Sequence, residues 1–372
     1  MVGGAPTISL MAIGMKFGMA ILGKMGKKLR KLQKSSKKWK KVSDKIHALA
    51  SKVTKHLPEN LRNKVHKGIC SVTGHPVDIA TGKVFTEIID FELPGPIPLV
   101  WERTWYSTSV HKGPLGHGWH HAYDLRLNYN ATDDCIIIRM SDGRNITFPV
   151  LLPGESAYNQ QEKMQLARDD RFYLLTDAEQ FTYRFRAPLG NSTAVQPLLS
   201  VENRAGFSIK FSHDQRGFLE QITDSAGRVI KVQCDGGGRI TSISAPHPDQ
   251  SNRYATLVSY RYDPLGNLSE SIDALEQPFR YFYQKHLLVK ETNRNGLSFF
   301  FEYDGTDETA WCVRTWGDGG IYDHKLTYNK EEKWTVVENS LGHKTQYFWN
   351  DDGLVFKTID PIGHETLTRY GD

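Results

Sequence analysis

The stretch Tyr262-Asp263-Pro264-Leu265-Gly266-Asn267-Leu268 contains the turn that decides the fold, because its spacing recurs along the second half of the chain. The same Asp-or-Asn, Gly and aliphatic positions return in Asp214-x-x-Gly217-x-Leu219 and Asn350-x-x-Gly353-x-Val355. In all three copies an Asp follows the first residue by ten positions, and equivalent turns lie 20 or 21 positions apart. The chain therefore repeats about every 21 residues.

The residue types of this turn have a physical reason. An Asp or Asn side chain can accept a hydrogen bond from the backbone two residues further on, and this bond opens a turn. Gly three positions later can adopt the positive φ that reverses the chain at low steric cost. Between turns the residues alternate with period two, as in Phe207-Ser-Ile-Lys-Phe211. We therefore predict that each unit is a β-hairpin and that the hairpins join edge to edge in one continuous sheet.

Composition agrees with strands and gives no pattern for a metal or disulfide framework. The chain has 16 Tyr and 17 Phe against 7 Met, a bias typical of β-sheets. From residue 80 onward no stretch has the pattern of a long helix. The four cysteines stand far apart with no Cys-x-x-Cys pair, so they support neither a zinc site nor a dense set of disulfides: Cys70, Cys135, Cys234 and Cys312.

The first 70 residues differ from the rest in charge. They hold 17 Lys and Arg and only two acidic residues, a net charge of +15, while the remainder holds 30 basic and 40 acidic residues, a net charge of −10. Residues 24–69 are predicted to form a basic amphipathic helical region. We predict that this region packs on its own chain rather than on nucleic acid, because no recognised nucleic-acid module accompanies the charge. Its apolar residues recur at helical spacing: Trp39, Val42, Ile46, Leu49 and Val53.

Residues 1–23 form an apolar N-terminal segment whose apolar run extends from Thr7 to Gly23, with Lys16 near its middle. A spanning helix needs about 20 apolar residues, and a central Lys costs roughly 2.5–3.5 kcal/mol on insertion. The basic residues follow the run instead of preceding it, so the segment does not match a cleavable signal peptide. Two alternatives stay open for residues 7–23: a helix that contacts a membrane or a chaperone, and a segment that is docked on the protein or frayed.

The region from residue 70 to 372 resembles the Rhs/YD-repeat family of polymorphic toxins. Its strand ends Tyr262-Asp263, Tyr303-Asp304 and Tyr328-Asn329 match the YD repeat. Further motifs match, in order, the domain that precedes the repeats in Rhs proteins: Thr73–Gly82, Leu93–Pro98, Trp101–Tyr106 and Gly113–Asp124. The resemblance implies a hollow β cocoon around a toxic C-terminal domain, which is commonly exported by a type VI secretion apparatus.

The expected fold class is mainly β, with hairpin repeats forming a continuous curved or spiral antiparallel sheet, part of a cocoon-like shell, after an N-terminal basic α-helical segment. Beyond the two N-terminal segments we expect an Rhs-associated β domain at 70–150, a β-rich connecting region at 151–200 and an incomplete array of YD repeats at 201–372. Rhs cores end in a self-cleavage motif, but here Val355 and His364 stand at its Pro and Leu positions. We interpret Asp360-Pro-Ile-Gly363 as an ordinary repeat turn.

Several residue groups suggest chemistry, and we interpret each of them as structural. His117, His120 and His121 have the spacing of metal ligands, with Asp124 as the nearest carboxylate, but they lie inside the family's Gly-His-Gly-Trp-His-His stretch. Gly236–Gly238 lacks the Lys-Ser/Thr of a phosphate-binding loop. We therefore predict no catalytic, cofactor-binding or metal-binding residues, and no cofactor. Adjacent acidic residues would point to opposite faces of a strand: Asp133-Asp134, Asp169-Asp170 and Asp351-Asp352.

The expected function is not enzymatic. It is the structural shell or plug portion of an Rhs-type toxin-delivery protein, similar to type VI secretion effectors, that encloses or guides a C-terminal toxin absent from this chain. The alternative is a cell-surface carbohydrate-binding adhesion module, because aromatic-rich YD sheets can present carbohydrate-binding faces. Expected partners are the toxin domain, the rest of the shell, a spike or PAAR-like protein and a chaperone, with no specific nucleic acid. We expect the bacterial cytoplasm before export by a specialised secretion apparatus.

Overall fold

A computed structural model describes residues 77–190, 192–250, 252–351 and 353–369. Apart from one short 3-10 helix, Asp318–Gly320, the regular structure of these residues is β-strand, so the predicted mainly β fold is confirmed. The predicted apolar segment 1–23 and basic helical region 24–69 lie outside the described residues. No helix within the described part of the chain is long and apolar enough to cross a membrane.

Twenty-three strands form one large sheet in which every strand pair is antiparallel. Strands β9 to β28 each pair with the next strand along the chain, and β6, β7 and β8 join this ladder where β6 pairs with the start of β13. The predicted chain of hairpins joined edge to edge is confirmed. The strands are β6 (Arg126–Asn130), β7 (Cys135–Arg139), β8 (Asn145–Pro149), β9 (Ser156–Asn159), β10 (Met164–Arg168), β11 (Phe172–Thr176), β12 (Thr182–Arg186), β13 (Gln196–Glu202), β14 (Ser208–His213), β15 (Leu219–Thr223), β16 (Val229–Cys234), β17 (Ile240–Pro246), β18 (Tyr254–Tyr262), β19 (Leu268–Asp273), β20 (Pro278–Gln284), β21 (Leu287–Thr292), β22 (Ser298–Tyr303), β23 (Cys312–Gly317), β24 (His324–Asn329), β25 (Trp334–Glu338), β26 (Lys344–Trp349), β27 (Val355–Ile359) and β28 (Glu365–Leu367).

The repeat turns share one hydrogen-bond pattern, which confirms the predicted turn chemistry. Asp263 Oδ1 accepts hydrogen bonds from the N–H groups of Leu265 and Asn267, both at 2.9 Å. The N–H of Gly266 donates to the Asp263 carbonyl at 3.0 Å, and Gly266 has a φ of +83°. The same side-chain pattern recurs at Asn203, Asp214, Asp224, Asp235, Asp273, Asn293, Asn339 and Asp360.

Replacing the turn carboxylate tests this pattern. We expect Asp263→Ala to lower the free energy of unfolding by about 1–2 kcal/mol, because two backbone donors lose an acceptor and each net hydrogen bond contributes about 0.5–1.5 kcal/mol. Asp263→Asn keeps the accepting oxygen and should cost less. Urea unfolding of the three proteins measures the difference. Equal losses in the two variants would show that the side chain does not act as the acceptor.

Tyrosines at the ends of β18, β22 and β24 each donate a hydrogen bond to the hairpin before their own. The hydroxyl of Tyr262 donates to the carbonyl of Ile240 at 2.6 Å, and the hydroxyl of Tyr303 donates to the carbonyl of Leu288 at 2.9 Å. Tyr328 does the same to Cys312 at 2.6 Å. Each ring packs against the core while its hydroxyl donates to a carbonyl, a combination that Phe cannot provide. In each Tyr-Asp pair the Tyr therefore bonds to the preceding hairpin, and in Tyr262-Asp263 the Asp opens the next turn.

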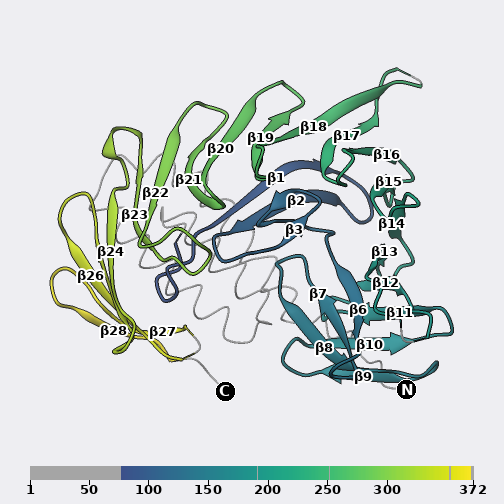
Figure 1. Cartoon of the computed structure of the whole chain (residues 1–372), viewed down its shortest axis with the longest axis horizontal. Helices are drawn as coiled ribbons and strands as arrows, with labels where there is room; N and C mark the ends of the chain where they lie inside the picture. The colour runs from purple at the N-terminus through teal and green to yellow at the C-terminus, as the bar shows by residue number, and fades with distance from the viewer. Residues whose placement is uncertain (1–76, 191, 251, 352, 370–372) are drawn as a thin grey trace, which may run out of the picture.

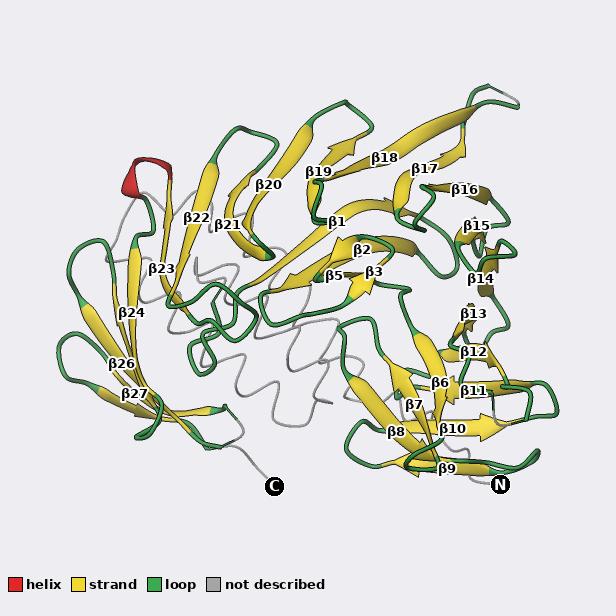
Figure 2. Cartoon of the chain, viewed as in Figure 1, coloured by secondary structure: helices red, strands yellow, loops and turns green. Residues whose placement is uncertain are grey.

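Residues 77–125 form a separate small element that we call the N-terminal unit. Its three-stranded antiparallel sheet consists of β1 (Phe85–Leu93), β2 (Leu99–Tyr106) and β5 (Trp119–His121) in the order β1-β2-β5. A short hairpin of β3 (Lys112–Gly113) and β4 (Gly116–His117) accompanies it. Figures 1 and 2 show the large sheet as a broad curve, with the N-terminal unit inside the curve beneath β17 to β21.

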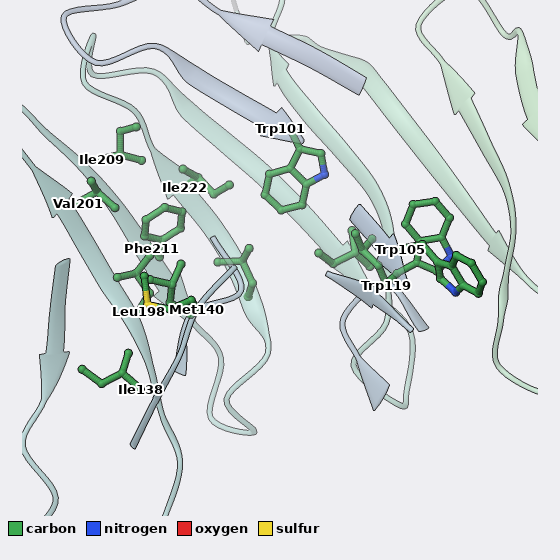
Figure 3. Close-up of a cluster of buried hydrophobic side chains, with 14 of the residues drawn as sticks. Trp101, Trp105, Trp119, Ile138, Met140, Leu198, Val201, Ile209, Phe211 and Ile222 are labelled. Atoms are coloured by element: carbon green, nitrogen blue, oxygen red, sulfur yellow. The ribbon is translucent and has the colours of Figure 1, made fainter. Parts of the chain in front are cut away.

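The core lies along the inside of this curve. One side chain in two on most repeat strands points inward, as in β14, where Ile209 and Phe211 are buried and Lys210 is exposed. The inward side chains of the sheet and those of the N-terminal unit form one continuous cluster. Figure 3 shows Trp105 and Trp119, which are partners on β2 and β5, side by side in this cluster. The core therefore fixes the N-terminal unit to the concave face.

Candidate functional site on the concave face

An arginine lies on the most buried face of the N-terminal unit. Period-two alternation on β2 places Trp101, Arg103 and Trp105 on the same face, and each of them is at most 1% exposed. A charged side chain that is fully buried among aromatic rings must have partners. In the sequence the signal is the alternation Trp101-x-Arg103-x-Trp105, a pattern that by itself predicts no role for Arg103.

The partners of Arg103 come from both the N-terminal unit and the large sheet. Its Nε and Nη2 donate to the carboxylate of Asp90 on β1, and the Nη2–Oδ1 distance is 2.9 Å. Nη2 also donates to Ser271 Oγ at 2.9 Å and to the Tyr281 hydroxyl at 3.2 Å, on β19 and β20. The guanidinium carbon lies 4.8 Å from the ring centroid of Trp119. Burial disfavours the charge, but Asp90 and the tyrosines outweigh it and raise the pKa of Arg103 well above its usual value.

Asp90 receives further donors from the large sheet. The Tyr260 hydroxyl donates to Asp90 Oδ2 at 2.5 Å, and Trp101 Nε1 donates to the Tyr260 oxygen at 2.9 Å. We call Arg103, Asp90, Tyr260, Ser271 and Tyr281 the Arg103 network. It joins β1 and β2 to β18, β19 and β20 through a buried ion pair that also bonds three hydroxyls, while Arg103 Nη1 has no hydrogen-bond partner among the described residues.

The β3–β4 hairpin adds backbone contacts to the same interface. The N–H of His117 donates to the carbonyl of Gly266 at 3.0 Å, and the N–H of Ile240 donates to the carbonyl of Pro114 at 2.7 Å. Trp119 Nε1 donates to the Tyr283 hydroxyl at 2.9 Å. The two backbone bonds connect the hairpin to β17 and to the Asp263 turn, and the Trp119 bond connects β5 to β20. The backbone bonds do not depend on flexible side chains, so they fix the position of the hairpin closely.

Glu291 on β21 is a partly buried acid at this interface. Its carboxyl is hydrogen-bonded to Thr86 of β1, and its Oε2 has no hydrogen-bond partner among the described residues. Burial raises the pKa of Glu291 to about 7, against the smaller opposite effects of Thr86 and Arg103. Below about pH 7 the neutral acid is therefore the main form in the folded protein.

This pKa predicts a pH-dependent stability. The folded pKa is raised, so the folded state is penalised as pH rises from about 4.5 through about 7, and the penalty is constant above that range. We expect Glu291→Gln to remove a penalty of up to about 3 kcal/mol at pH 8 and to change little at pH 4.5. Urea unfolding of both proteins at the two pH values isolates this group, because the other carboxylates are common to both. A difference that does not grow with pH would contradict the raised pKa.

The three histidines singled out in the sequence do not converge. His117 stacks on His286 with ring centroids 3.8 Å apart, and His121 stacks on Trp101 at 4.5 Å. His120 instead stacks on His111 at 4.6 Å. Burial lowers the pKa of His117 and of His121 to about 4 and that of His120 to about 3, so all three are neutral at pH 7.

His111, His120 and Asp124 each offer one ligand atom within 4.8 Å of the others, a spacing that could hold a metal ion. Asp124 is fully buried and already accepts hydrogen bonds from His111 Nε2 at 2.8 Å and from Arg139 Nη2 at 2.8 Å. Arg139 Nη1 lies 2.7 Å from His111 Nδ1 and Arg126 lies beside the same carboxylate. Two guanidinium groups thus supply the positive charge that a metal would bring. We interpret the set as a hydrogen-bonded structural cluster, because Asp124 is already paired with arginine.

The remaining candidates of the sequence lie in turns. Asp133 and Asp134 lie between β6 and β7, and Asp169 and Asp170 lie between β10 and β11. Gly236–Gly238 belongs to the turn that Asp235 opens. Asp351 lies in the turn between β26 and β27, and Asp352 is outside the described residues. His111 was missed because no motif marks it.

The fold and this interface define a class of protein: an antiparallel YD-type repeat sheet that curves around an N-terminal unit. Family models agree with both parts. The model described as Teneurin YD-shell matches residues 176–309, and the one described as Domain of unknown function (DUF6531) matches residues 74–148. Together with relatives named Tse5, RhsA and RhsB, these matches support an Rhs/YD-repeat family protein.

Relatives carry toxin names. The chain is 27% identical over 288 residues to Double-stranded DNA deaminase toxin A of Burkholderia cenocepacia (strain H111), covering 76% of this chain and 19% of that protein. It is 24% identical over 363 residues to Toxin protein Tse5 of Pseudomonas aeruginosa, covering 80% and 27%. It is 26% identical over 301 residues to Probable deoxyribonuclease RhsB of Dickeya dadantii (strain 3937), covering 79% and 20%. The chain thus spans about a fifth to a quarter of the length of these relatives.

Proposed function

We propose that this chain is a non-catalytic shell and plug portion of an Rhs-type toxin-delivery protein. The observation that carries the proposal is the concave face itself. The N-terminal unit occupies it through the Arg103 network and a backbone-bonded hairpin. In this proposal these contacts hold the plug, which is the N-terminal unit, against the inner face of the shell, which is the large sheet. The buried ionisable groups also suit a structural role, because Asp90 and Asp124 are each paired with arginine.

The cargo in this proposal is a toxin domain that lies outside this chain. The deaminase and deoxyribonuclease activities are those of the named relatives, of whose length this chain spans a small share. By analogy we propose residence in the bacterial cytoplasm before export through a specialised apparatus of the type VI kind. The rest of the shell, a spike or PAAR-like protein and a chaperone would be the other partners.

Expression of the chain in the cytoplasm of a bacterium without an immunity protein tests the non-catalytic role. We expect growth equal to that of cells carrying an empty vector. Growth arrest caused by the soluble, folded protein would contradict the proposal. If that arrest disappeared in His120→Ala or His121→Ala, while the variant still folded, it would point to an enzyme.

A second candidate function, carbohydrate binding at a cell surface, has one observation in its favour. The face turned away from the N-terminal unit carries an aromatic row in which Phe300 stacks on Trp316 with ring centroids 5.3 Å apart and Phe282 is 44% exposed. Aromatic platforms of this kind can stack on sugar rings. A glycan array probed with the wild type and with Trp316→Ala separates the candidates: binding lost in the variant would favour adhesion over containment.

A further inference from the structure

The N-terminal unit has a second face that the Arg103 network does not use. Side chains of β1 and β2 alternate, so Glu87, Ile89, Glu92 and Glu102 lie opposite to the face of Arg103. In the register, Ile89 pairs with Glu102, and Glu87 and Glu92 flank Ile89 along β1, on either side of an irregularity at Asp90. Ile89 is 53% exposed. We call these four residues the acidic face.

We propose that residues 24–69 of this same chain dock on the acidic face. Charge complementarity is the first argument, because that segment contains 16 Lys and Arg against Asp44 and Glu59. Pattern is the second: the apolar stripe from Trp39 to Val53 is bordered by lysines, and the acidic face has an apolar centre bordered by carboxylates. Apolar contact at the centre with charge pairs at the rim is the usual composition of a protein interface.

The segment 24–69 and the acidic face are separated by only a short stretch of chain. Val77, the first described residue, pairs with Val84 immediately before β1. Ile89 lies five residues beyond Val84, about 17 Å along an extended strand. Residues 70–76 can span up to about 25 Å, so residue 69 can reach the acidic face without crossing the large sheet. The short tether also raises the effective concentration of the segment at this face.

Docking there would give the basic segment a defined place inside the curve of the sheet. It would also offset part of the opposite charges, +15 and −10, of the two parts of the chain. The contact is expected to weaken with salt, since pairs at the surface are screened beyond about 10 Å at 0.1 M ionic strength. This inference stands apart from the proposed shell function, because it concerns only contacts within this chain.

Site-specific photocrosslinking in the full chain tests the contact. p-Benzoylphenylalanine in place of Ile89 is expected to cross-link within the chain to peptides from residues 24–69, with a yield independent of protein concentration. The control carries the same amino acid in place of Leu265, which is 63% exposed at a turn of the large sheet, and should give no such product. Absence of the cross-link from the Ile89 position, a product with other peptides, or a yield that rises with concentration would overturn the proposal.

Charge reversal provides a second, independent test. In the Ile89 photocrosslinking protein, the triple change Glu87→Lys, Glu92→Lys and Glu102→Lys is expected to lower the yield roughly tenfold, from about 0.2–1 kcal/mol for each surface pair. Adding Lys38→Glu, Lys41→Glu and Lys45→Glu should restore it. The matched control reverses three exposed carboxylates elsewhere, Glu179, Glu220 and Glu302, and should leave the yield unchanged. A yield insensitive to the first triple change, in protein whose melting shows it to be folded, would refute the docking.

Discussion

Arg103→Ala is expected to lower the free energy of unfolding by about 3–5 kcal/mol, because it removes the buried, two-point cation of Asp90 and leaves that carboxylate only Arg294, 3.4 Å away. The loss should be accompanied by release of the N-terminal unit, since Ser271 and Tyr281 lose their bonds across the interface at the same time. Chemical denaturation followed by tryptophan fluorescence measures both effects, because Trp101, Trp105 and Trp119 lie at this interface.

A surface ion pair provides the comparison for this substitution. Arg314 and Asp323 make a two-point contact at 2.8–3.0 Å on partly exposed side chains, so Arg314→Ala should cost at most about 1 kcal/mol. The double variant Asp90→Asn with Arg103→Met removes both charges and should cost less than Arg103→Ala alone. If the two single arginine variants lost the same stability, Arg103 would not be the buried link that its contacts indicate.

Gly116→Val is expected to cost about 2–5 kcal/mol, from two sources. Gly116 has a φ of +86°, which costs a residue with a Cβ about 1–2 kcal/mol. A Cβ at this position would lie 2.5 Å from the carbonyl oxygen of Gly266, a backbone atom that cannot rotate away. The β3–β4 hairpin must then withdraw from the Asp263 turn, which adds about 1–3 kcal/mol.

Gly206→Val separates strain from contact. Gly206 has a φ of +84°, but nothing lies within 4 Å of the position that its Cβ would take. Only the backbone penalty applies there, so the loss should be about 1–2 kcal/mol. Thermal melting of the two variants under the same conditions compares them. Equal losses would mean that Gly116 does not approach the Gly266 carbonyl.

Much of the large sheet followed from local chemistry. Asp263, Gly266 and their counterparts act through bonds within five residues, so their spacing predicted the turns, the hairpins and the order of pairing. Side-chain alternation predicted which face is buried for the same reason, since it depends on nothing beyond the strand. The turn with Glu276 at the Gly position still forms, with a φ of +60°, because its Asp273 carboxylate keeps both backbone bonds.

The concave interface did not follow from the sequence, because its partners are far apart in the chain. Arg103 meets Ser271 and Tyr281 more than 160 residues away, and no spacing rule connects them. In the histidine stretch, local spacing is misleading. The spacing suggests a single metal site, yet His120 and His121 are adjacent on a strand and point to opposite sides. The domain borders at 70–150, 151–200 and 201–372 stay predictions.

Hydrogen exchange of β2 in the full chain tests most directly whether the N-terminal unit is held inside the curve of the sheet. We predict that the amides of Leu99–Tyr106 exchange as slowly as those of β18 in the wild type. In Arg103→Ala the β2 amides should exchange much faster, while those of β10 and β11, distant from the network, keep their wild-type rates. Rapid exchange of β2 in the wild type, with slow exchange of β18, would show that the N-terminal unit is not held inside the curve of the sheet.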